Sequence, residues 1–423
     1  MSMSVWTAAC RLLAKHLASG ERLDALMEAL PGQMPAEDKR RCRHLLYGTV
    51  RHLGLLDAVL ATHLAKTPRP MLRAVLLAGA FELMEHAENA PVIVHHWVGV
   101  ARQSTSAGEA RLVNAVLRRM PAALAVVTES RSREPAALAL RFSHPEWLVR
   151  RWIERFGEEA TLALLGWDQQ PAPVHARVVD DAQVRGTLPD FFHETRWPGF
   201  YRLERLDWPV VEAMLTDGRV YIQDPATAIA PGLLAPSAGE TLLDVCAAPG
   251  GKTFQLAEKV GPGGRVIAID LKGARLERLR RNLAARSHLP VTVFGADATT
   301  LTTDQLAGAE LPIEFDAALV DAPCSNTGVL QHRVDVKTRL QPSDLDGLAR
   351  LQLAILQRTA ALVRAGGRLV YSTCSLEKEE NEDVVAVFLR EAGEAWSLER
   401  AEHSRPWESG CDGAGAFLLR RSS

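Results

Sequence analysis

The 423-residue sequence lacks the features that mark membrane, disulfide-linked and metal-binding proteins. No apolar run approaches the length of about 18 residues that spans a bilayer, and the N-terminus lacks the uninterrupted apolar region of a secretion signal. The six cysteines stand far apart, with no C-x-x-C pattern and no Cys/His cluster. We therefore expect a cytoplasmic protein that contacts no membrane, binds no metal and keeps its thiols reduced.

The sequence also lacks an excess of charge of either sign. The formal net charge is −2, so the chain as a whole carries no signal for a polyanionic partner. The first 150 residues nevertheless hold 19 Lys and Arg against 13 Asp and Glu, which permits contact with nucleic acid without establishing it. The length suits two or three domains. No coiled-coil pattern is present, and we expect a monomer.

The first third of the chain has helical periodicity throughout. Apolar residues recur at i, i+3 and i+4 in residues 45–64 and 68–86, and Pro70 suits a helix start. We predict an all-α domain over residues 1–128.

A linker helix and a small α+β unit are predicted to follow, over residues 140–225. Residues around 126–145 are loosely patterned and lead into a helix at EWLVRRWIERFG. The arginines of that helix either face RNA or form a solvated surface. Residues 170–225 mix short apolar runs with turns, which predicts a small α+β unit.

From residue 240 onwards, predicted strands and helices alternate. This rhythm is typical of a doubly wound, mostly parallel sheet, and we assign residues 226–423 to such an α/β domain. Its first strand runs into a turn of small residues and then a helix, in the sequence TLLDVCAAPGGKT. That geometry lets a backbone approach a nucleotide closely at a helix N-terminus.

The ligand of this turn is predicted to be a nucleoside without phosphates. The turn does not match the phosphate-binding pattern G-x-x-x-x-G-K-[ST], and Pro249 removes a backbone donor. S-adenosylmethionine is such a ligand. Asp270 closes the next apolar run, about 20 residues past Gly250, where a Rossmann-like fold places a ribose-binding carboxylate. A purely structural turn is the alternative.

Reactive side chains follow several predicted strands of the same sheet. Because ligands bind at the carboxyl ends of strands, we expect these side chains to share one edge: Asp270, Asp297, Asp321, Cys324 and Cys374. A lone cysteine there is usually a small buried residue, but two suggest chemistry. A thiolate that adds to carbon 6 of a pyrimidine makes carbon 5 nucleophilic enough to attack a methyl sulfonium. This chemistry alone leaves open which thiol attacks.

Three motifs give the chain a family resemblance. DVCAAPGGKT, DAPCS and YSTCS, followed by EKEENEDVV, resemble the signature of RNA cytosine-5 methyltransferases of the Sun/nucleolar-protein family. LLYGTVR and RLVNAVLRR resemble a NusB-type RNA-binding helical domain. The combination is similar to RsmB-type 16S ribosomal RNA methyltransferases. It implies a NusB-like domain, an α+β RNA-recognition unit and a Rossmann-like methyltransferase domain.

The resemblance also implies roles for the motif residues. Cys374 would attack carbon 6 and Cys324 would assist product release. Asp321 would lie between the cofactor and the cytosine, with Lys252 near the reacting ring. Asp270 would bind the ribose hydroxyls and Asp297 the adenine edge. The methionine end of the cofactor would be wrapped by Cys246, Ala247, Ala248, Pro249, Gly250, Gly251 and Lys252.

Two points stay open in the sequence. Residues 379–382, after the nucleophile, serve either as a structural helix cap or as part of the site. The run QHRVDVKTRL departs from the family's Arg-Arg-His-Pro-Asp-like pattern in a segment expected to line the RNA. The predicted substrate is ribosomal RNA. The alternatives are transfer RNA as the substrate and a non-catalytic RNA-binding assembly factor.

Overall fold

A computed structural model describes residues 4–179, 185–205 and 207–423. The chain divides into two compact units. Unit 1 comprises Met1–Pro171 and Leu330–Leu340, and unit 2 comprises Ala172–Val329 and Gln341–Ser423. The three-part division expected from the sequence stays a prediction. Among the described residues, no helix has the length and apolar character that crossing a bilayer requires.

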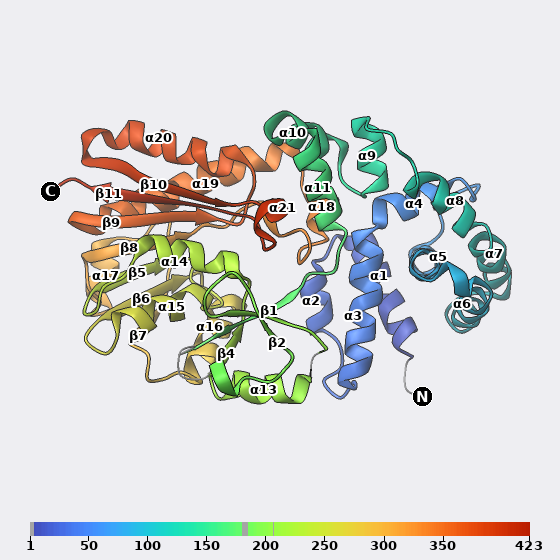
Figure 1. Ribbon diagram of the computed structural model, residues 1–423, viewed down its shortest axis with the longest axis horizontal. Helices are drawn as coiled ribbons and strands as arrows, with labels where there is room; N and C mark the ends of the chain where they lie inside the picture. Colours follow the sequence, from blue (N-terminus) through green and yellow to red (C-terminus); the bar gives the residue numbers. More distant parts are fainter. Residues whose placement is uncertain (1–3, 180–184, 206) are drawn as a thin grey trace. The chain divides into compact units, whose positions relative to one another are not determined.

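Unit 1 is built from helices (Figure 1). They are α1 (Val5–Ser19), α2 (Leu23–Glu28), α3 (Ala36–Arg51), α4 (Leu53–Ala61), α5 (Pro70–Glu85), η1 (Ala87–Asn89), α6 (Ala90–Ser104), α7 (Ala107–Leu117), α8 (Met120–Thr128), α9 (Pro135–Arg141), α10 (Glu146–Phe156), α11 (Glu158–Asp168) and, from the second segment, α18 (Val336–Arg339). Local signals set several ends: Pro70 opens α5, and Ser106 with Glu109 forms a capping box on α7. The all-α prediction is confirmed.

One prediction for this unit is wrong. Part of the stretch expected to be a loose linker forms the helix α9, whose Leu138 is fully buried. The seven-residue helix is too short to show a convincing period in the sequence, and it is stabilised by packing rather than by propensity.

The segment Leu330–Leu340 belongs to unit 1 although it follows the DAPCS motif. Val334 is fully buried in the helical core. The Lys337 ammonium is buried and donates to Arg51 O at 2.7 Å. The Arg51 guanidinium donates in turn to Gln331 O at 3.1 Å. The basic group of Lys337 is therefore used inside the protein, whereas the sequence placed it along the RNA.

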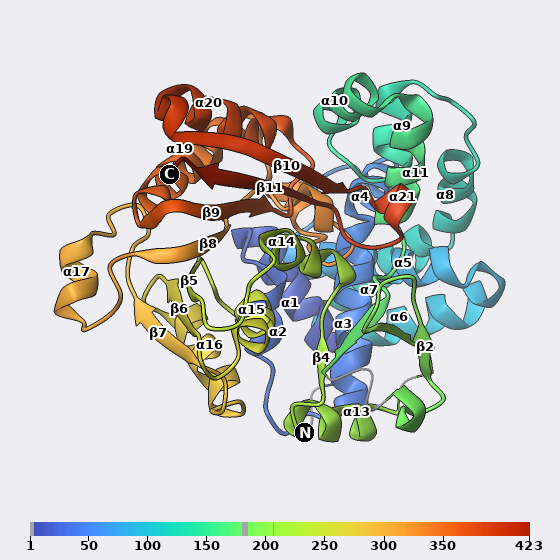
Figure 2. The ribbon, with the colours of Figure 1, turned by 60° about the vertical axis from the view of Figure 1, so that its left-hand side comes forward.

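Unit 2 contains two sheets (Figure 2). The small antiparallel sheet has the order β2-β3-β1-β4, and the large one has the order β10-β11-β9-β8-β5-β6-β7. The strands are β1 (Val174–Val178), β2 (Phe192–Glu194), β3 (Phe200–Leu203), β4 (Val220–Ile222), β5 (Thr241–Val245), β6 (Arg265–Asp270), β7 (Val291–Gly295), β8 (Phe315–Asp321), β9 (Val363–Thr373), β10 (Trp396–Ser404) and β11 (Ala414–Arg421). The larger helices are α13 (Trp208–Thr216), α14 (Ile229–Leu234), α15 (Gly251–Val260), α16 (Ala274–Ala284), α17 (Thr303–Gly308), α19 (Pro342–Ala361) and α20 (Glu382–Ala392). Short helical segments are η2 (Arg185–Thr187), η3 (Pro225–Ala228), η4 (Thr327–Val329), η5 (Lys378–Glu380), η6 (Gly393–Ala395) and α21 (Pro406–Ser409).

Helices cover both faces of the large sheet (Figures 1 and 2). Alternate strand residues point to opposite faces. Leu243 and Ile267 pack with α17, α19 and α20, whereas Leu242 and Val266 pack with α14 and α15. The α/β prediction is confirmed, and β5 to β9 pair in parallel.

The strand β10 was not predicted from the sequence. It pairs antiparallel with β11, which itself pairs antiparallel with β9. Most of its side chains are exposed, in keeping with its place at the edge of the sheet. Because it buries little apolar surface, its sequence has no clear alternating pattern.

Candidate active site

The turn between β5 and α15 is built from small residues in tight backbone conformations. Cys246 and Gly250 have positive φ angles of 62° and 109°. A Cβ atom on Gly250 would lie 2.7 Å from Leu279 Cδ1, so a side chain there would clash with α16. The Gly250 N–H donates to Ala247 O at 2.8 Å, and α15 begins at Gly251. The turn thus runs directly into a helix N-terminus, as the sequence predicted.

Asp270 connects this turn to the end of β6 by hydrogen bonds. Its Oδ2 accepts the Ala248 N–H at 2.9 Å, and its Oδ1 accepts the Leu271 N–H at 2.8 Å. Arg275 lies 3.6 Å from the same carboxylate and donates to Ala248 O at 3.0 Å. On the other side of the turn, the Pro249 carbonyl accepts an amide hydrogen bond from α16 at 2.9 Å. Asp270 is therefore fixed in place, and a carboxylate retains lone pairs for further donors such as hydroxyls.

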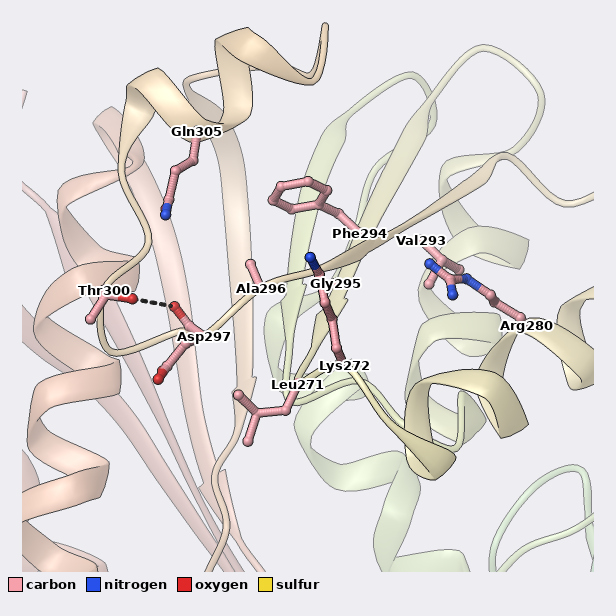
Figure 3. A pocket seen from close by; sticks show the side chains of 10 residues that line it. All are labelled: Leu271, Lys272, Arg280, Val293, Phe294, Gly295, Ala296, Asp297, Thr300 and Gln305. Atoms are coloured by element: carbon pink, nitrogen blue, oxygen red, sulfur yellow. Dashed lines mark hydrogen bonds between the residues drawn. The ribbon is translucent and has the colours of Figure 1, made fainter.

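A pocket of about 710 Å³ opens beside the ends of β6 and β7 (Figure 3). Asp297 is exposed at its border, and two hydrogen bonds from Thr299 lower the pKa of this carboxyl. The apolar side chain of Leu271 is 60% exposed at the same opening. An exposed apolar side chain next to an ionised carboxylate suits a flat polar ring. The lining residues are Leu271, Lys272, Arg280, Val293, Phe294, Gly295, Ala296, Asp297, Thr300 and Gln305.

The two cysteines of the DAPCS and YSTCS motifs face each other. Cys324 follows β8, Cys374 follows β9, and their Sγ atoms are 3.2 Å apart. The two strands are paired in parallel, with Asp321 opposite Ser372, which brings the two motifs to one edge. The hydrogen bond to Cys374, together with burial, raises the pKa of the Cys324 thiol well above its usual range. The pair can therefore supply one nucleophilic sulfur and one thiol that stays protonated.

A half-buried ion pair lies beside the thiols. Lys252 Nζ, from the first turn of α15, is 2.6 Å from Asp321 Oδ2. Burial acts to lower the pKa of Lys252, but the negative charges of Asp321 and Cys374 outweigh it and leave the pKa raised. Ser372 Oγ donates to the other oxygen of Asp321 at 3.3 Å. The ammonium of Lys252 is thereby held in place near Cys374.

The third cysteine of the site has a different environment. Burial, with the nearby charges of Asp270 and Asp321, raises the pKa of the Cys246 thiol to about 12. Those charges also show that the nucleoside-type turn and the Lys252–Asp321 pair share one edge. The structure thus brings together Lys252, Asp270, Asp321 and the three cysteines around a single region of unit 2. Asp297 lies at the outer border of that region.

A buried carboxylate joins the two cysteine loops, and no clear pattern in the sequence indicated it. Glu380 is fully buried. It accepts the Ser325 N–H at 2.8 Å, the Ser375 hydroxyl at 2.5 Å and the Gln352 amide at 2.9 Å, and it also binds the Ser325 hydroxyl. The one sequence feature that could have pointed to this network is the Cys-Ser pair that both motifs contain. No sequence feature pointed to Gln352, in the middle of α19.

The neighbouring Asn381 bears on the question left open for residues 379–382. It is the N-cap residue of α20 but makes no capping hydrogen bond with its side chain. Its amide donates to Ser375 O at 2.9 Å and to Glu377 O at 3.0 Å, and it accepts the Thr373 hydroxyl at 2.8 Å. Glu380 and Asn381 therefore shape the loop that carries Cys374, and neither serves as an ordinary side-chain helix cap.

Comparisons with known proteins agree with this geometry. Residues 231–412 match the family "16S rRNA methyltransferase RsmB/F", and residues 5–121 match the NusB family. The probable ribosomal RNA small subunit methyltransferase B of Bacillus subtilis (strain 168) is 31% identical over 362 residues, which cover 82% of this chain and 79% of the relative.

Further similarities extend over nearly the whole length. The ribosomal RNA small subunit methyltransferase B of Escherichia coli O157:H7 is 29% identical over 422 residues, covering 96% of this chain and 94% of the relative. The solved structure of PH0851 covers all of both chains, with a TM-score of 0.79 and 24% identity, and is evidence for the fold alone. The matched families, their extent and the two-thiol geometry lead to one conclusion: this chain belongs to the RsmB/F family of 16S rRNA methyltransferases and carries an N-terminal NusB domain.

Proposed function

We propose that this protein transfers the methyl group of S-adenosylmethionine to carbon 5 of a cytosine in 16S ribosomal RNA, through a covalent Cys374–cytosine intermediate. The observation that carries the proposal is the pair of facing thiols, 3.2 Å apart, beside the Lys252–Asp321 ion pair. A methyl transfer to oxygen or to an exocyclic nitrogen needs no thiol, whereas carbon 5 of a pyrimidine must first be activated by addition at carbon 6.

The residues around the turn suit S-adenosylmethionine. The tight turn at Gly250 brings the backbone close to a ligand, Asp270 has a carboxylate fixed for ribose hydroxyls, and the pocket at Leu271 and Asp297 suits an adenine ring. When bound, this cofactor supplies an electrophilic methyl group. Lys252, at the start of α15, connects this region to the thiols.

Cys374 opens the reaction as the nucleophile. Once the S–H proton has passed to solvent, its thiolate sulfur forms a bond to carbon 6, and the electrons of the carbon 5–carbon 6 double bond move into the ring, which makes carbon 5 a nucleophile. Lys252 places a positive charge near this sulfur. Asp321, held between Lys252 and Ser372, is placed to hold the polar edge of the cytosine and favour the addition.

Cys324 acts at product release. After methylation the proton on carbon 5 must leave, its electrons re-form the double bond, and the carbon 6–sulfur bond breaks to return the Cys374 thiolate. The raised pKa of Cys324 comes first from its hydrogen bond to Cys374. Once Cys374 is a thioether, that hydrogen bond no longer opposes ionisation, so Cys324 gives its proton to solvent and its thiolate can take the proton from carbon 5.

Radiolabelled methyl transfer to unmodified small-subunit ribosomal RNA tests the proposal. We expect transfer by wild type, none by Cys374→Ala, and a stable RNA–protein adduct with Cys324→Ala. Cys411→Ala removes a buried thiol of unit 2 that lies outside the three site cysteines, and it serves as the matched control. If Cys374→Ala still methylates and Cys324→Ala forms no adduct, the roles of the thiols are reversed. If the protein methylates transfer RNA and not ribosomal RNA, transfer RNA is its substrate. If it binds RNA but methylates none, it is better explained as a non-catalytic assembly factor.

A further inference from the structure

Asn326 follows the Cys324-Ser325 pair and has an unusual backbone conformation. Its φ angle is +63°, a region in which glycine carries no steric cost and asparagine is among the better-tolerated side chains. A glycine would satisfy this turn equally well. The reason for a side chain at this position must therefore lie in what its amide contacts.

The orientation of the Asn326 amide is fixed by the backbone. Its Nδ2 donates to Cys324 O at 2.8 Å. A carbonyl oxygen accepts only, so the NH2 group must be the end that faces it. The amide oxygen Oδ1 is then left to face Cys374, whose Sγ lies 3.4 Å away.

These contacts determine which acceptor each of the two S–H groups faces. Each thiol has one S–H, and an amide oxygen can only accept. Cys374 therefore donates its proton to Asn326 Oδ1, and Cys324 is left to donate its own proton to Cys374 Sγ, 3.2 Å away. In this chain of hydrogen bonds Cys374 is the sulfur that receives a donor, and its remaining lone pair has a defined direction.

We propose that Asn326 is a further catalytic residue, whose amide holds the S–H of Cys374 and thereby fixes which of the two sulfurs attacks and in which direction. This inference rests on the proposed function, because it concerns the nucleophile of that reaction. Without the amide, the Cys374 S–H is free to turn towards Cys324. The two thiols then exchange donor and acceptor roles, and fewer encounters with the cytosine are productive.

The test compares two substitutions that keep the backbone conformation. Asn326→Gly suits a positive φ and removes the amide, and Asn326→Asp keeps the shape but places a carboxylate beside the thiol. Glu310→Gly is the matched control, since Glu310 is an exposed residue of unit 2 with a φ of +57°. Single-turnover methyl transfer at saturating RNA and cofactor is measured together with the alkylation rate of Cys374 by iodoacetamide without RNA. Trypsin places Cys374 in the peptide of residues 369–378, separate from Cys324.

The expected results differ in direction between the two assays. Asn326→Gly should lower the single-turnover rate at saturating RNA by about 10- to 100-fold, because the nucleophile is no longer held in the direction of attack. The same variant should be alkylated a few-fold faster at Cys374, because the thiol has lost its acceptor. Asn326→Asp should be alkylated more slowly than wild type, because a neighbouring negative charge disfavours the thiolate.

Other outcomes would overturn the inference. A wild-type rate in Asn326→Gly would reduce Asn326 to a turn residue. Faster alkylation in both variants, or earlier exposure of the buried Cys411 in urea, would indicate a loosened loop and a structural role only. If wild type transfers no methyl group to any RNA, the proposed function fails, while the opposite alkylation shifts still report whether the amide governs the thiol.

Discussion

The strongest prediction concerns the buried carboxylate of Glu380, which links the loops that carry Cys324 and Cys374. In Glu380→Ala the Ser325 N–H loses its acceptor, whereas the Gln352 amide keeps a second one at Pro323 O. The hydroxyls of Ser325 and Ser375 can still pair with each other across 3.0 Å. An orphaned buried donor costs about 1–3 kcal/mol, and the cavity left by the side chain adds to this, so we expect a loss of about 3–5 kcal/mol.

Glu380→Gln separates the hydrogen bonds from the charge. Its amide oxygen can accept from Ser325 and Gln352, and its NH2 group can donate to the two serine hydroxyls. We expect a change within about 1 kcal/mol of wild type. Burial raises the pKa of Glu380, and its hydrogen bonds offset this only in part.

The raised pKa of Glu380 also determines how the stability of the protein changes with pH. A group with a raised folded-state pKa contributes stability that is fully present below its unfolded pKa, about 4.3 for Glu, and is lost as pH rises through the folded pKa. Glu380→Gln has no such loss, so its stability relative to wild type should rise with pH from about 4 upwards.

Pulsed alkylation in a urea series measures these effects unit by unit. Cys411 is buried in unit 2, and Cys10 and Cys42 are buried in unit 1, so each unit has its own reporter. With an m-value of about 2 kcal/mol per M, Glu380→Ala should expose Cys411 at about 2 M less urea than wild type.

The control is Asp383→Ala, which removes an exposed carboxylate 3.7 Å from Lys378 and should cost less than about 1 kcal/mol. The reasoning is refuted if Glu380→Ala exposes Cys411 at the wild-type urea concentration. It is also refuted if Glu380→Gln is as unstable as Glu380→Ala, because the charge itself would then be needed.

Three further predictions follow from single contacts. Asp270→Asn cannot accept both the Ala248 and Leu271 N–H groups, so binding of S-adenosylmethionine should weaken at least tenfold by calorimetry, and unchanged affinity would contradict the assignment of the turn. Gly328→Ala places a Cβ 2.8 Å from Cys374 O, so single-turnover methyl transfer should fall about tenfold or more, and a normal rate would show that the loop has room to move. Lys337→Met should destabilise unit 1 by about 1–3 kcal/mol because the buried Arg51 carbonyl loses the donor at 2.7 Å, as read from Cys42 alkylation, and an unchanged stability would show that this carbonyl finds another donor. Burial lowers the pKa of Lys337 to about 7, so the contribution of this residue to stability rises with pH between about 7 and 10.4. If the Lys337→Met variant showed the same rise of stability with pH, Lys337 would not be its cause.

The fold class and the motif residues were readable from the sequence because they depend on local patterns. Helical spacing around Pro70 and apolar runs such as residues 242–245 arise from periodicities of 3.6 and 2 residues, which short-range contacts enforce. Polar residues directly after strands identified Asp270, Asp321, Cys324 and Cys374, since parallel strands end at one edge. The edge strand β10 and the short helix α9 had weak patterns, because neither can be recognised without the surfaces it packs on.

Only the tertiary structure decided how the groups of the site act on one another. Glu380 and Gln352 lie 28 residues apart in the sequence, and Asn326 and Cys374 lie 48 apart, so no local pattern connects them. Lys337 reads as a basic surface residue in the sequence, yet folding buries it against Arg51, 286 residues away. The residue types were set by the sequence. Their protonation, partners and burial depend on long-range packing, because the free energy of a buried polar group is determined by the neighbours that folding brings to it.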